Sequence, residues 1–307
     1  MRSRLVVARL RWLAGPRPGV LLAAGLLVAF LVVGFGYEFV SSSAASRRHA
    51  ERSLAAQAAV SSELTSSLVT SSAASMEAQA AKLFGGHRPD ESALTALVER
   101  QRGLAYAFVA GGSGQVLARS KGAPDGVGGQ ASEHQAMAGA LGGRIWLSNL
   151  LYPASHRAAV VELVVPFRTA FGPRVLVEGL EAKLLGVFLD GYFGRLGRGS
   201  GQVSYVVDAG DRVVANSAGK AVGQRLPAAV AAGGSVTVGG VHRFVASAPL
   251  AGSSWRVLLS EPTAKLYAGF AGRAQWVLKA VLAVLALVGL SSLLFLRRML
   301  VGRAHVE

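Results

Sequence analysis

The string RVLVEGLEAKLLGVF at Arg174–Phe188 returns 82 residues later as RVLLSEPTAKLYAGF at Arg256–Phe270, with seven of fifteen positions identical. Self-similarity at such a spacing indicates a duplicated structural unit. The repeat therefore predicts two tandem domains of one fold, and superposing them is expected to bring Lys183 onto Lys265 and Phe188 onto Phe270. Chance similarity in a chain rich in Ala, Val, Gly and Leu is the alternative.

Shorter echoes precede the two strings in the same order. The pair Pro166-Phe167 is matched by Pro249-Leu250, Tyr106 is echoed by Tyr205, and QVLARS at Gln115 is echoed by RVVANS at Arg212. Matches that keep their order in both halves favour a true duplication.

Each half contains short runs rich in β-branched residues, separated by glycine-rich turns, and each ends in a helix-like stretch. Such runs predict small antiparallel sheets with attached helices, which is an α+β fold class. The expected strands are residues 104–110, 115–120, 144–149, 159–166 and 174–179 in the first half, and 203–207, 212–216, 235–238, 243–248 and 256–260 in the second. A glycine-rich linker at 194–201 separates the halves.

Two long apolar runs enclose these halves. Residues 19–40 carry one charge, Glu38, and residues 277–296 carry one charge, Lys279. A helix of about 20 apolar residues crosses the hydrocarbon core of a membrane, so both runs are expected to be transmembrane helices. A cleaved signal peptide is the alternative for the first run, and a buried core helix is the alternative for the second.

Arginine-rich flanks give the expected orientation. Arginines precede the first run and follow the second, so residues 1–18 and 297–307 are expected in the cytoplasm and residues 41–276 outside the cell membrane. Hydrophobic residues make up 51% of the chain and charged residues 16%, against about 25% charged in soluble domains. The net charge of +15 is distributed along the chain rather than clustered, so nucleic acid is not an expected partner.

Residues 41–84 contain no proline or glycine, and Val60, Leu64 and Leu68 recur at a spacing of four. This pattern predicts a weakly amphipathic helix. At 1.5 Å per residue it would extend roughly 66 Å, long enough to run beside two stacked domains. The alternative is a flexible Ser/Ala-rich stalk.

The order of a membrane span, a long helix, two repeated domains and a second span resembles the double Cache sensors of bacterial chemoreceptors, histidine kinases and cyclic-dinucleotide enzymes. Four phrases carry the resemblance: GRIWLSNLLYP at Gly143, VVELVVPFRTAFGPRVLVEG at Val160, SYVVDAGDRVVANS at Ser204 and PLAGSSWRVLLSEP at Pro249. The resemblance implies a PAS-like membrane-distal Cache domain at 85–193 and a PAS-like membrane-proximal one at 194–276.

An amino-acid-binding variant of this family carries an Arg-x-Trp-Tyr element and a later aspartate in its distal pocket. Arg144 and Trp146 match the element, but Leu147 stands in place of its tyrosine. Glu162 and Glu178 are the downstream acids, and neither is the aspartate of the pattern.

One strand and its exit loop collect the candidate ligand-binding residues. Arg144, Trp146 and Ser148 alternate and would share one face of a regular strand. Asn149 and Tyr152 follow in the strand and its exit loop, and Tyr152 is expected on the pocket rim. Arginine suits a carboxylate or phosphate, and tryptophan suits an apolar or cationic part of a ligand. The alternative is a core tryptophan and a surface arginine.

A buried arginine needs an ionic partner when no ligand is present. Glu162 or Glu178 is the expected partner of Arg144, and an anionic ligand would replace that acid.

Catalytic and metal-binding motifs are not found in the sequence. The chain has no cysteine, and its six histidines lie at no metal-ligand spacing, so neither an enzyme nor a cofactor or metal is expected. The sequence therefore predicts a membrane-anchored sensor that binds a small molecule and signals to a cytoplasmic kinase, cyclase or chemotaxis output, absent from this chain or supplied by a partner. A degenerate Cache protein that serves as an envelope anchor is the alternative, and a homodimer is left open.

Overall fold

The computed structural model describes residues 18–123, 138–153, 158–184, 186–187, 191, 201–217, 221–268, 276, 279–281, 283–285 and 287–288. The chain divides into two compact units. The larger unit, Ala50–Leu266, contains both sheets, and the other combines residues 1–49 with residues 267–307.

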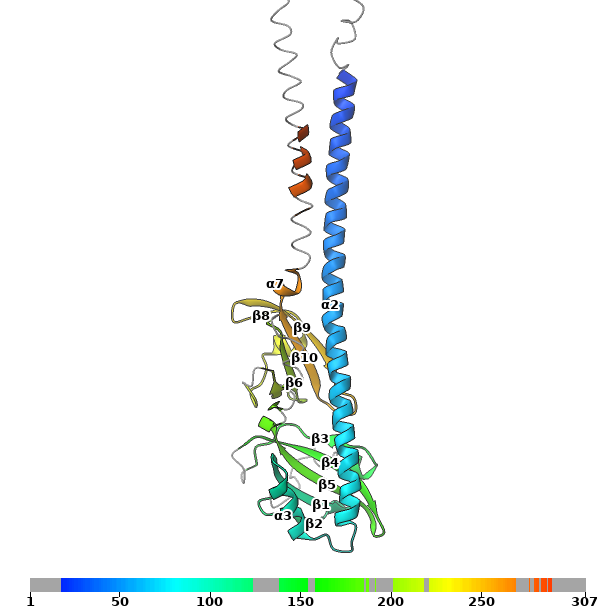
Figure 1. The fold of residues 1–307 in the computed structure, drawn as a ribbon, viewed down its shortest axis with the longest axis vertical. Coiled ribbons are helices and arrows are strands. Elements are labelled where there is room, and N and C mark those ends of the chain that lie inside the picture. Colours follow the sequence, from blue (N-terminus) through cyan, green and yellow to red (C-terminus); the bar gives the residue numbers. More distant parts are fainter. Residues whose placement is uncertain are drawn as a thin grey trace, which may run out of the picture. The chain divides into compact units, whose positions relative to one another are not determined.

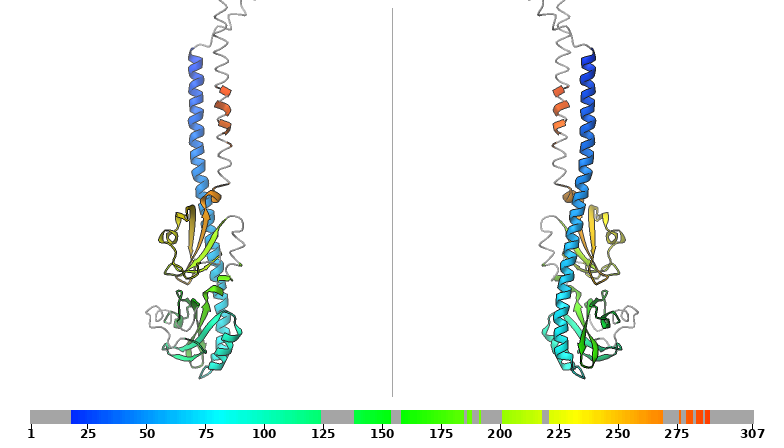
Figure 2. Two further views of the ribbon diagram at one scale, coloured as in Figure 1. Left: turned by 90° about the vertical axis from the view of Figure 1, so that its left-hand side faces the viewer. Right: turned by 90° about the vertical axis from the view of Figure 1, so that its right-hand side faces the viewer.

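Two five-stranded antiparallel sheets form the larger unit, and their strands lie alongside the C-terminal half of the long helix α2 in every view (Figures 1 and 2). The strand order is β2-β1-β5-β4-β3 in the first sheet and β7-β6-β10-β9-β8 in the second, so both sheets have one topology. The elements are α2 (Pro18–Phe84), α3 (Glu91–Arg100), β1 (Leu104–Gly111), β2 (Val116–Arg119), β3 (Trp146–Leu147), β4 (Val160–Thr169), β5 (Gly172–Glu181), β6 (Val203–Val207), β7 (Val213–Asn216), α6 (Ala228–Ala232), β8 (Gly234–Val238), β9 (Val241–Pro249), β10 (Arg256–Pro262) and α7 (Thr263–Leu266).

The predicted α+β class and the long N-terminal helix are confirmed. Helix α2 is continuous through the stretch for which a flexible stalk was the alternative. Its second half buries one face, because Leu54, Ala58 and Ala73 pack in a cluster with residues of both sheets. Val165 of the first sheet and Val257 of the second belong to this cluster. The helix therefore shares one continuous core with the two sheets.

Helix α2 is also fastened to both sheets by polar contacts. Ser62 and Ser66 donate hydrogen bonds to the carbonyl oxygens of Pro249 (2.5 Å) and Ala251 (3.2 Å) in the second domain. At the far end, the guanidinium of Arg174 donates to the carbonyls of Phe84 (2.7 Å), Gly86 (2.6 Å) and His87 (3.2 Å). A cation at this position satisfies carbonyls that the end of a helix leaves unpaired and suits its negative dipole end.

The duplication extends to an irregularity of the strands. In the first sheet Val109 pairs with Ala118 and Ala110 pairs with Val116, so that β2 has one extra residue in a bulge. In the second sheet Val206 pairs with Ala215 and Val207 pairs with Val213. A bulge at the same place in both sheets supports common descent of the two domains.

The residue-by-residue alignment of the repeated strings is nevertheless wrong by one position. Pro166 pairs with Val175, whereas Pro249 pairs with Arg256. Since the two prolines correspond, Val175 rather than Arg174 is the structural counterpart of Arg256. In the strands that precede Lys183 and Lys265, the structural alignment differs by one residue from the alignment that would superpose the two lysines. Phe188 and Phe270 lie outside the described residues.

This one-residue difference in alignment matters because neighbouring strand residues point to opposite faces of a sheet. Arg174 reaches α2, whereas Arg256 pairs with Asp211 and donates to the carbonyl of Ala231. With the corrected register, Leu176 corresponds to Val257, and both pack on the side of α2. Glu178 then corresponds to Leu259.

Membrane spans were expected at 19–40 and 277–296. No helix composed of the described residues is both long and apolar enough to cross a membrane.

Candidate functional site

The two faces of the first sheet carry different clusters. One face packs on α2 through Val109, Leu176 and their neighbours. The opposite face, here called the outer face, carries an aromatic and aliphatic cluster that includes Tyr106, Phe108 and Val164. Alternation along each strand separates the two sets. The outer face is the candidate ligand site, because a ligand pocket combines apolar walls with a few convergent polar groups.

A tyrosine and an acid form the polar centre of the outer face. The hydroxyl of Tyr106 donates a hydrogen bond of 2.7 Å to Oε1 of Glu162, and both side chains are buried. The ring of Tyr106 can lie here because Gly179 stands opposite it in β5. A Cβ at Gly179 would come within 2.6 Å of that ring. The glycine thus positions the tyrosine, and the tyrosine positions the carboxylate.

Aromatic side chains surround this pair. The rings of Tyr106 and Phe108 lie nearly parallel, with centroids 6.4 Å apart. Trp146, half-buried in β3, packs against the same cluster, whereas the next residue, Leu147, packs in the core beside α2. Trp146 and Leu147 therefore lie on opposite faces of the sheet, and a role of Trp146 as a wall for a ligand stays a prediction.

Ser148 follows β3 and is buried. Its hydroxyl accepts the backbone N–H of Glu162 at 2.8 Å, and its backbone N–H donates to the carbonyl of Glu162 at 2.9 Å. The serine therefore holds the backbone of the acid through its hydroxyl and its backbone N–H.

Arg144 lies in the turn that precedes β3, and its side chain is exposed. Among the described residues it pairs with neither Glu162 nor Glu178, so the expected ion pair is not formed. The physical reason is positional: the strand begins only at Trp146, and an exposed guanidinium needs no buried partner. Arg144 is not brought into the centre of the outer face.

Glu178 is buried on the other face of the sheet, toward α2. Its neighbours in β5 at a spacing of two, Leu176 and Leu180, both pack against the cluster at the end of α2. Its Oε2 has no hydrogen-bond partner among the described residues. Burial raises the pKa of Glu178 to about 7, because an apolar environment disfavours the charged form. The two nominated acids therefore lie on opposite faces of one sheet.

The exit loop of β3 forms a contact between the two domains. The carbonyl of Ser148 accepts the indole N–H of Trp255 at 3.0 Å. Oδ1 of Asn149 accepts the N–H of Ala209 at 3.2 Å, and Oδ2 of Asp208 accepts the N–H of Leu150 at 2.9 Å. We call Ser148, Asn149, Leu150, Asp208 and Trp255 the joint.

Tyr152 extends the contact beyond the joint. Its side chain is exposed, and its hydroxyl donates to the carbonyl of Gly223 at 3.4 Å. Tyr152, expected on the pocket rim, and Asn149, also a candidate ligand-binding residue, thus contact the second domain.

Tyr106 and Gly179 are the site residues that the sequence did not identify. The sequence repeat aligns Tyr106 with Tyr205. In the structure Phe108 is the counterpart of Tyr205, because each of them pairs with the last residue of the adjacent short strand. A glycine in the middle of an apolar strand is the signal that was available, because it marks the close approach of another group.

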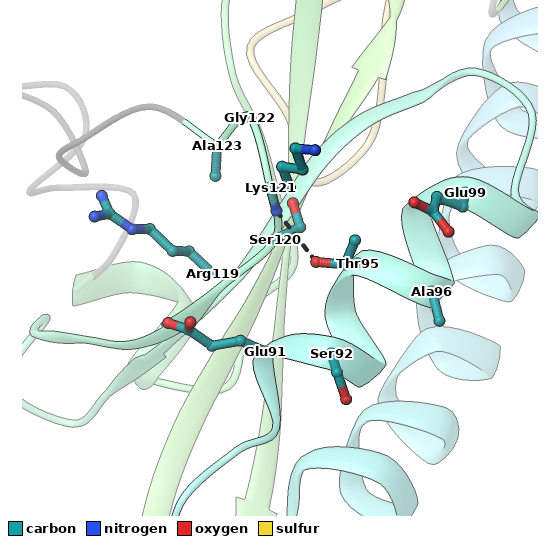
Figure 3. Close-up of a pocket in the computed structure, with 10 residues that line it drawn as sticks. All are labelled: Glu91, Ser92, Thr95, Ala96, Glu99, Arg119, Ser120, Lys121, Gly122 and Ala123. Atoms are coloured by element: carbon teal, nitrogen blue, oxygen red, sulfur yellow. Dashed lines mark hydrogen bonds between the residues drawn. The ribbon is translucent and has the colours of Figure 1, made fainter.

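A concave region lies between α3 and the end of β2 (Figure 3). Its volume is about 650 Å³, and its side chains, including Glu91, Glu99 and Lys121, are exposed. Ser120 is buried there, but its hydroxyl already accepts the N–H of Ala107 at 3.0 Å. Most of this hollow is thus lined by exposed or half-buried side chains, unlike the buried cluster of the outer face. Within the described part of the chain no group of three acids or histidines could hold a metal ion.

Comparison with known proteins identifies the fold. No family model and no curated protein match the chain. Among solved structures, the ligand-binding domain of the chemoreceptor CtaA of Pseudomonas fluorescens in complex with L-isoleucine is similar, with a TM-score of 0.52 and 16% identity over 73% of this chain and 97% of that one. The complex of the same domain with L-leucine has a TM-score of 0.51, 16% identity, and coverage of 73% and 99%.

A histidine kinase is represented as well. The extracellular domain assigned to the histidine kinase rpHK1S-Z16 has a TM-score of 0.50 and 11% identity, covering 70% of this chain and 95% of that one. These neighbours are ligand-binding domains of a chemoreceptor and the extracellular domain of a kinase. The chain thus has the fold of these chemoreceptor and kinase domains, which is consistent with the double Cache resemblance of its sequence.

Proposed function

We propose that the chain is a membrane-anchored receptor whose outer region, residues 41–276, binds a small molecule. Its fold is that of chemoreceptor ligand-binding domains and of a kinase extracellular domain. In this proposal residues 19–40 and 277–296 span the cell membrane, and residues 1–18 and 297–307 are cytoplasmic. Residues 85–193 form the membrane-distal Cache domain, and residues 194–276 form the membrane-proximal one.

Exposed apolar side chains on the two end segments support the anchoring. Phe30, Tyr37 and Trp276 are each 76% exposed, and Leu287 is 64% exposed. Side chains of this size gain free energy when lipid replaces water around them. Tyrosine and tryptophan at the outer ends of the runs suit the membrane interface.

The observation that carries ligand binding is the Tyr106–Glu162 pair on the aromatic outer face. Glu162 gives this face a negative group, which attracts a ligand with an ammonium. Trp146 and Phe108 supply walls for an apolar part, and a cation beside an aromatic ring is favourable. The proposed ligand is therefore a small amine with an apolar side chain, a class to which the L-isoleucine and L-leucine held by CtaA also belong.

The joint provides a route by which binding would reach the second domain. Ser148 holds the backbone of Glu162 on one side and accepts the indole of Trp255 on the other. Trp255 directly precedes β10, which leads into α7 and the second proposed span. A ligand shifts such an equilibrium only if it binds one arrangement of the joint more tightly than the other.

The ligand claim is tested by a thermal-shift screen of the full chain in nanodiscs. Small amines, amino acids and carboxylic acids are compared as three classes. Stabilisation by amines or amino acids that disappears in Glu162→Gln supports the proposal. Stabilisation by carboxylic acids alone, or equal stabilisation of Glu162→Gln, contradicts the assignment of the outer face.

Topology is tested separately with one reporter fused after Glu307 and another inserted at Gly112, in the turn between β1 and β2. The proposal predicts a cytoplasmic reporter at the first position and an extracytoplasmic one at the second. The reverse result at either position contradicts the proposed orientation.

A further inference from the structure

A cavity of about 330 Å³ lies where α2, the first sheet and the second domain meet. Leu68 and Val69 of α2 form one wall, Leu163 and Leu180 of the first sheet form another, and Trp255 closes the side toward the second domain. It lies on the face of the first sheet that packs on α2, so it is separate from the outer face. Ligand pockets begin at about this volume.

Apolar side chains at the mouth of the cavity remain in contact with water. Leu68 is 37% exposed and Leu184 is 41% exposed, although both line a concave region. Scattered apolar residues on a surface are ordinary, but apolar residues gathered around a cavity mark a binding site. An occupant with an apolar body would remove this surface from water and gain free energy in proportion to the area covered.

The charged groups that line the cavity come from the ends of two elements of the first domain. Gln101 and Arg102 come from the turn between α3 and β1, and Glu181 comes from the end of β5. The side chain of Arg102 is exposed and has no hydrogen bond or ion pair within the described parts of the chain. A guanidinium in this position can hold a carboxylate through two parallel hydrogen bonds.

We propose that this cavity is a second binding site, for an acidic amphiphile whose apolar tail fills the cavity and whose carboxylate meets Arg102. At the roughly 30 Å³ that one water molecule occupies in the liquid, the space holds about ten groups of that size. A saturated chain of about ten carbons is therefore a suitable probe.

The location gives such a ligand contact with α2 and with both domains. The cavity is lined by α2, by Leu147 of β3 and by Trp255. Leu147 directly precedes Ser148, which accepts the hydrogen bond of Trp255 in the joint. An occupant would therefore press on both domains and on the helix that leads to the membrane.

The experiment is calorimetric titration of the full chain in nanodiscs with decanoate, decan-1-ol and decylamine. Titration of empty nanodiscs subtracts partitioning into lipid. The expected result is saturable binding of decanoate, with at least tenfold weaker binding of decan-1-ol and decylamine. Arg102→Gln should weaken decanoate about tenfold and leave decan-1-ol unchanged.

A pair of α2 variants tests the cavity itself. Ser72 lines the cavity and Ser75 does not, and both are exposed serines of α2. Ser72→Leu should weaken decanoate at least tenfold, and Ser75→Leu should bind as the wild type does. Equal binding by the two variants, or binding of decan-1-ol as tight as that of decanoate, overturns the proposal. Because Glu162→Gln leaves this cavity intact, loss of the outer-face site would not imitate either result.

Discussion

The indole nitrogen of Trp255 donates a hydrogen bond of 3.0 Å to the carbonyl oxygen of Ser148, and this bond joins the two domains. Both residues are buried, at 2% and 1% exposure. Ser148 also fixes the backbone of Glu162 in the candidate site. The bond therefore connects the site to the domain that leads toward the second proposed span.

Trp255→Phe should lower the free energy of unfolding by about 2–4 kcal/mol. The substitution leaves a buried carbonyl without its donor and also leaves a void in the core. Urea denaturation of the full chain, followed by circular dichroism, measures the change. Tyr152→Phe is the matched control, because it removes only an exposed interdomain bond of 3.4 Å, and it should change stability by less than about 0.5 kcal/mol. Equal effects of the two variants would show that the joint does not stabilise the unit.

Gly179→Ala should lower stability by about 1–3 kcal/mol and weaken ligand binding at the outer face. The added Cβ would come within 2.6 Å of the Tyr106 ring, which must then move away from Glu162. Gly139→Ala is the control, because a Cβ there meets nothing within 4 Å. Thermal unfolding and ligand titration are measured for both variants. An unaltered ligand affinity in Gly179→Ala would argue against a role for Tyr106.

Arg174→Ala should lower stability by about 3 kcal/mol or more. Its guanidinium donates to three carbonyls at the end of α2, and hydrogen bonds to charged donors are the stronger kind. Arg174→Lys keeps the charge near the helix end and should recover part of the loss. Arg168→Ala removes an exposed arginine of the neighbouring strand, and urea denaturation should show almost no change for it. A loss in Arg168→Ala as large as that in Arg174→Ala would contradict this assignment.

Glu178 should make stability depend on pH. Burial raises the pKa of its carboxyl in the folded state to about 7, above its ordinary value, so the folded protein binds the proton more tightly than the unfolded chain does. The stability that the protonated Glu178 contributes is then complete at low pH and is lost as the pH rises through about 7. The loss amounts to roughly 3 kcal/mol between pH 4 and pH 8.

Two variants isolate this dependence in denaturation curves measured at several pH values. Glu178→Leu places at this position the residue type found at its counterpart Leu259, and it should flatten the pH dependence and raise stability at pH 8. Glu181→Gln removes a half-exposed acid of the same strand and should retain the slope. A slope that persists in Glu178→Leu would assign the pH dependence to other groups.

The duplication, the strands and the α+β class could be predicted because strand periodicity and glycine turns are local signals. The register of the repeated strings could not. Identical letters aligned Arg174 with Arg256, but the stretch from Pro166 to its pairing partner Val175 is longer than the equivalent stretch of the second sheet. As a result, the structural counterpart of Arg256 is Val175, one residue after the Arg174 that the identical letters indicate. A one-residue shift exchanges the two faces of a strand, so the two arginines serve unrelated contacts.

The candidate site shows the same limit. The opposite orientation of Trp146 and Leu147 follows from alternation within one strand, whereas the contact of Ser148 with the backbone of Glu162 was not predicted. The partner of Glu162 did not follow, because Tyr106 is 56 residues away in sequence and only strand pairing brings them together. Arg144 failed as a buried cation because β3 is two residues long, shorter than the sequence suggested.

The most direct test of ligand sensing at the outer face is calorimetric titration of the strongest amine or amino acid from the screen into the full chain and its variants. The dissociation constant should rise at least tenfold in Glu162→Gln, which corresponds to about 1.4 kcal/mol or more. It should stay within about twofold of wild type in Glu99→Gln, which removes an exposed charge from α3 and leaves the outer face unaltered. A Glu162→Gln variant that is folded and binds the ligand as tightly as the wild type would contradict the assignment of this face as the sensory site.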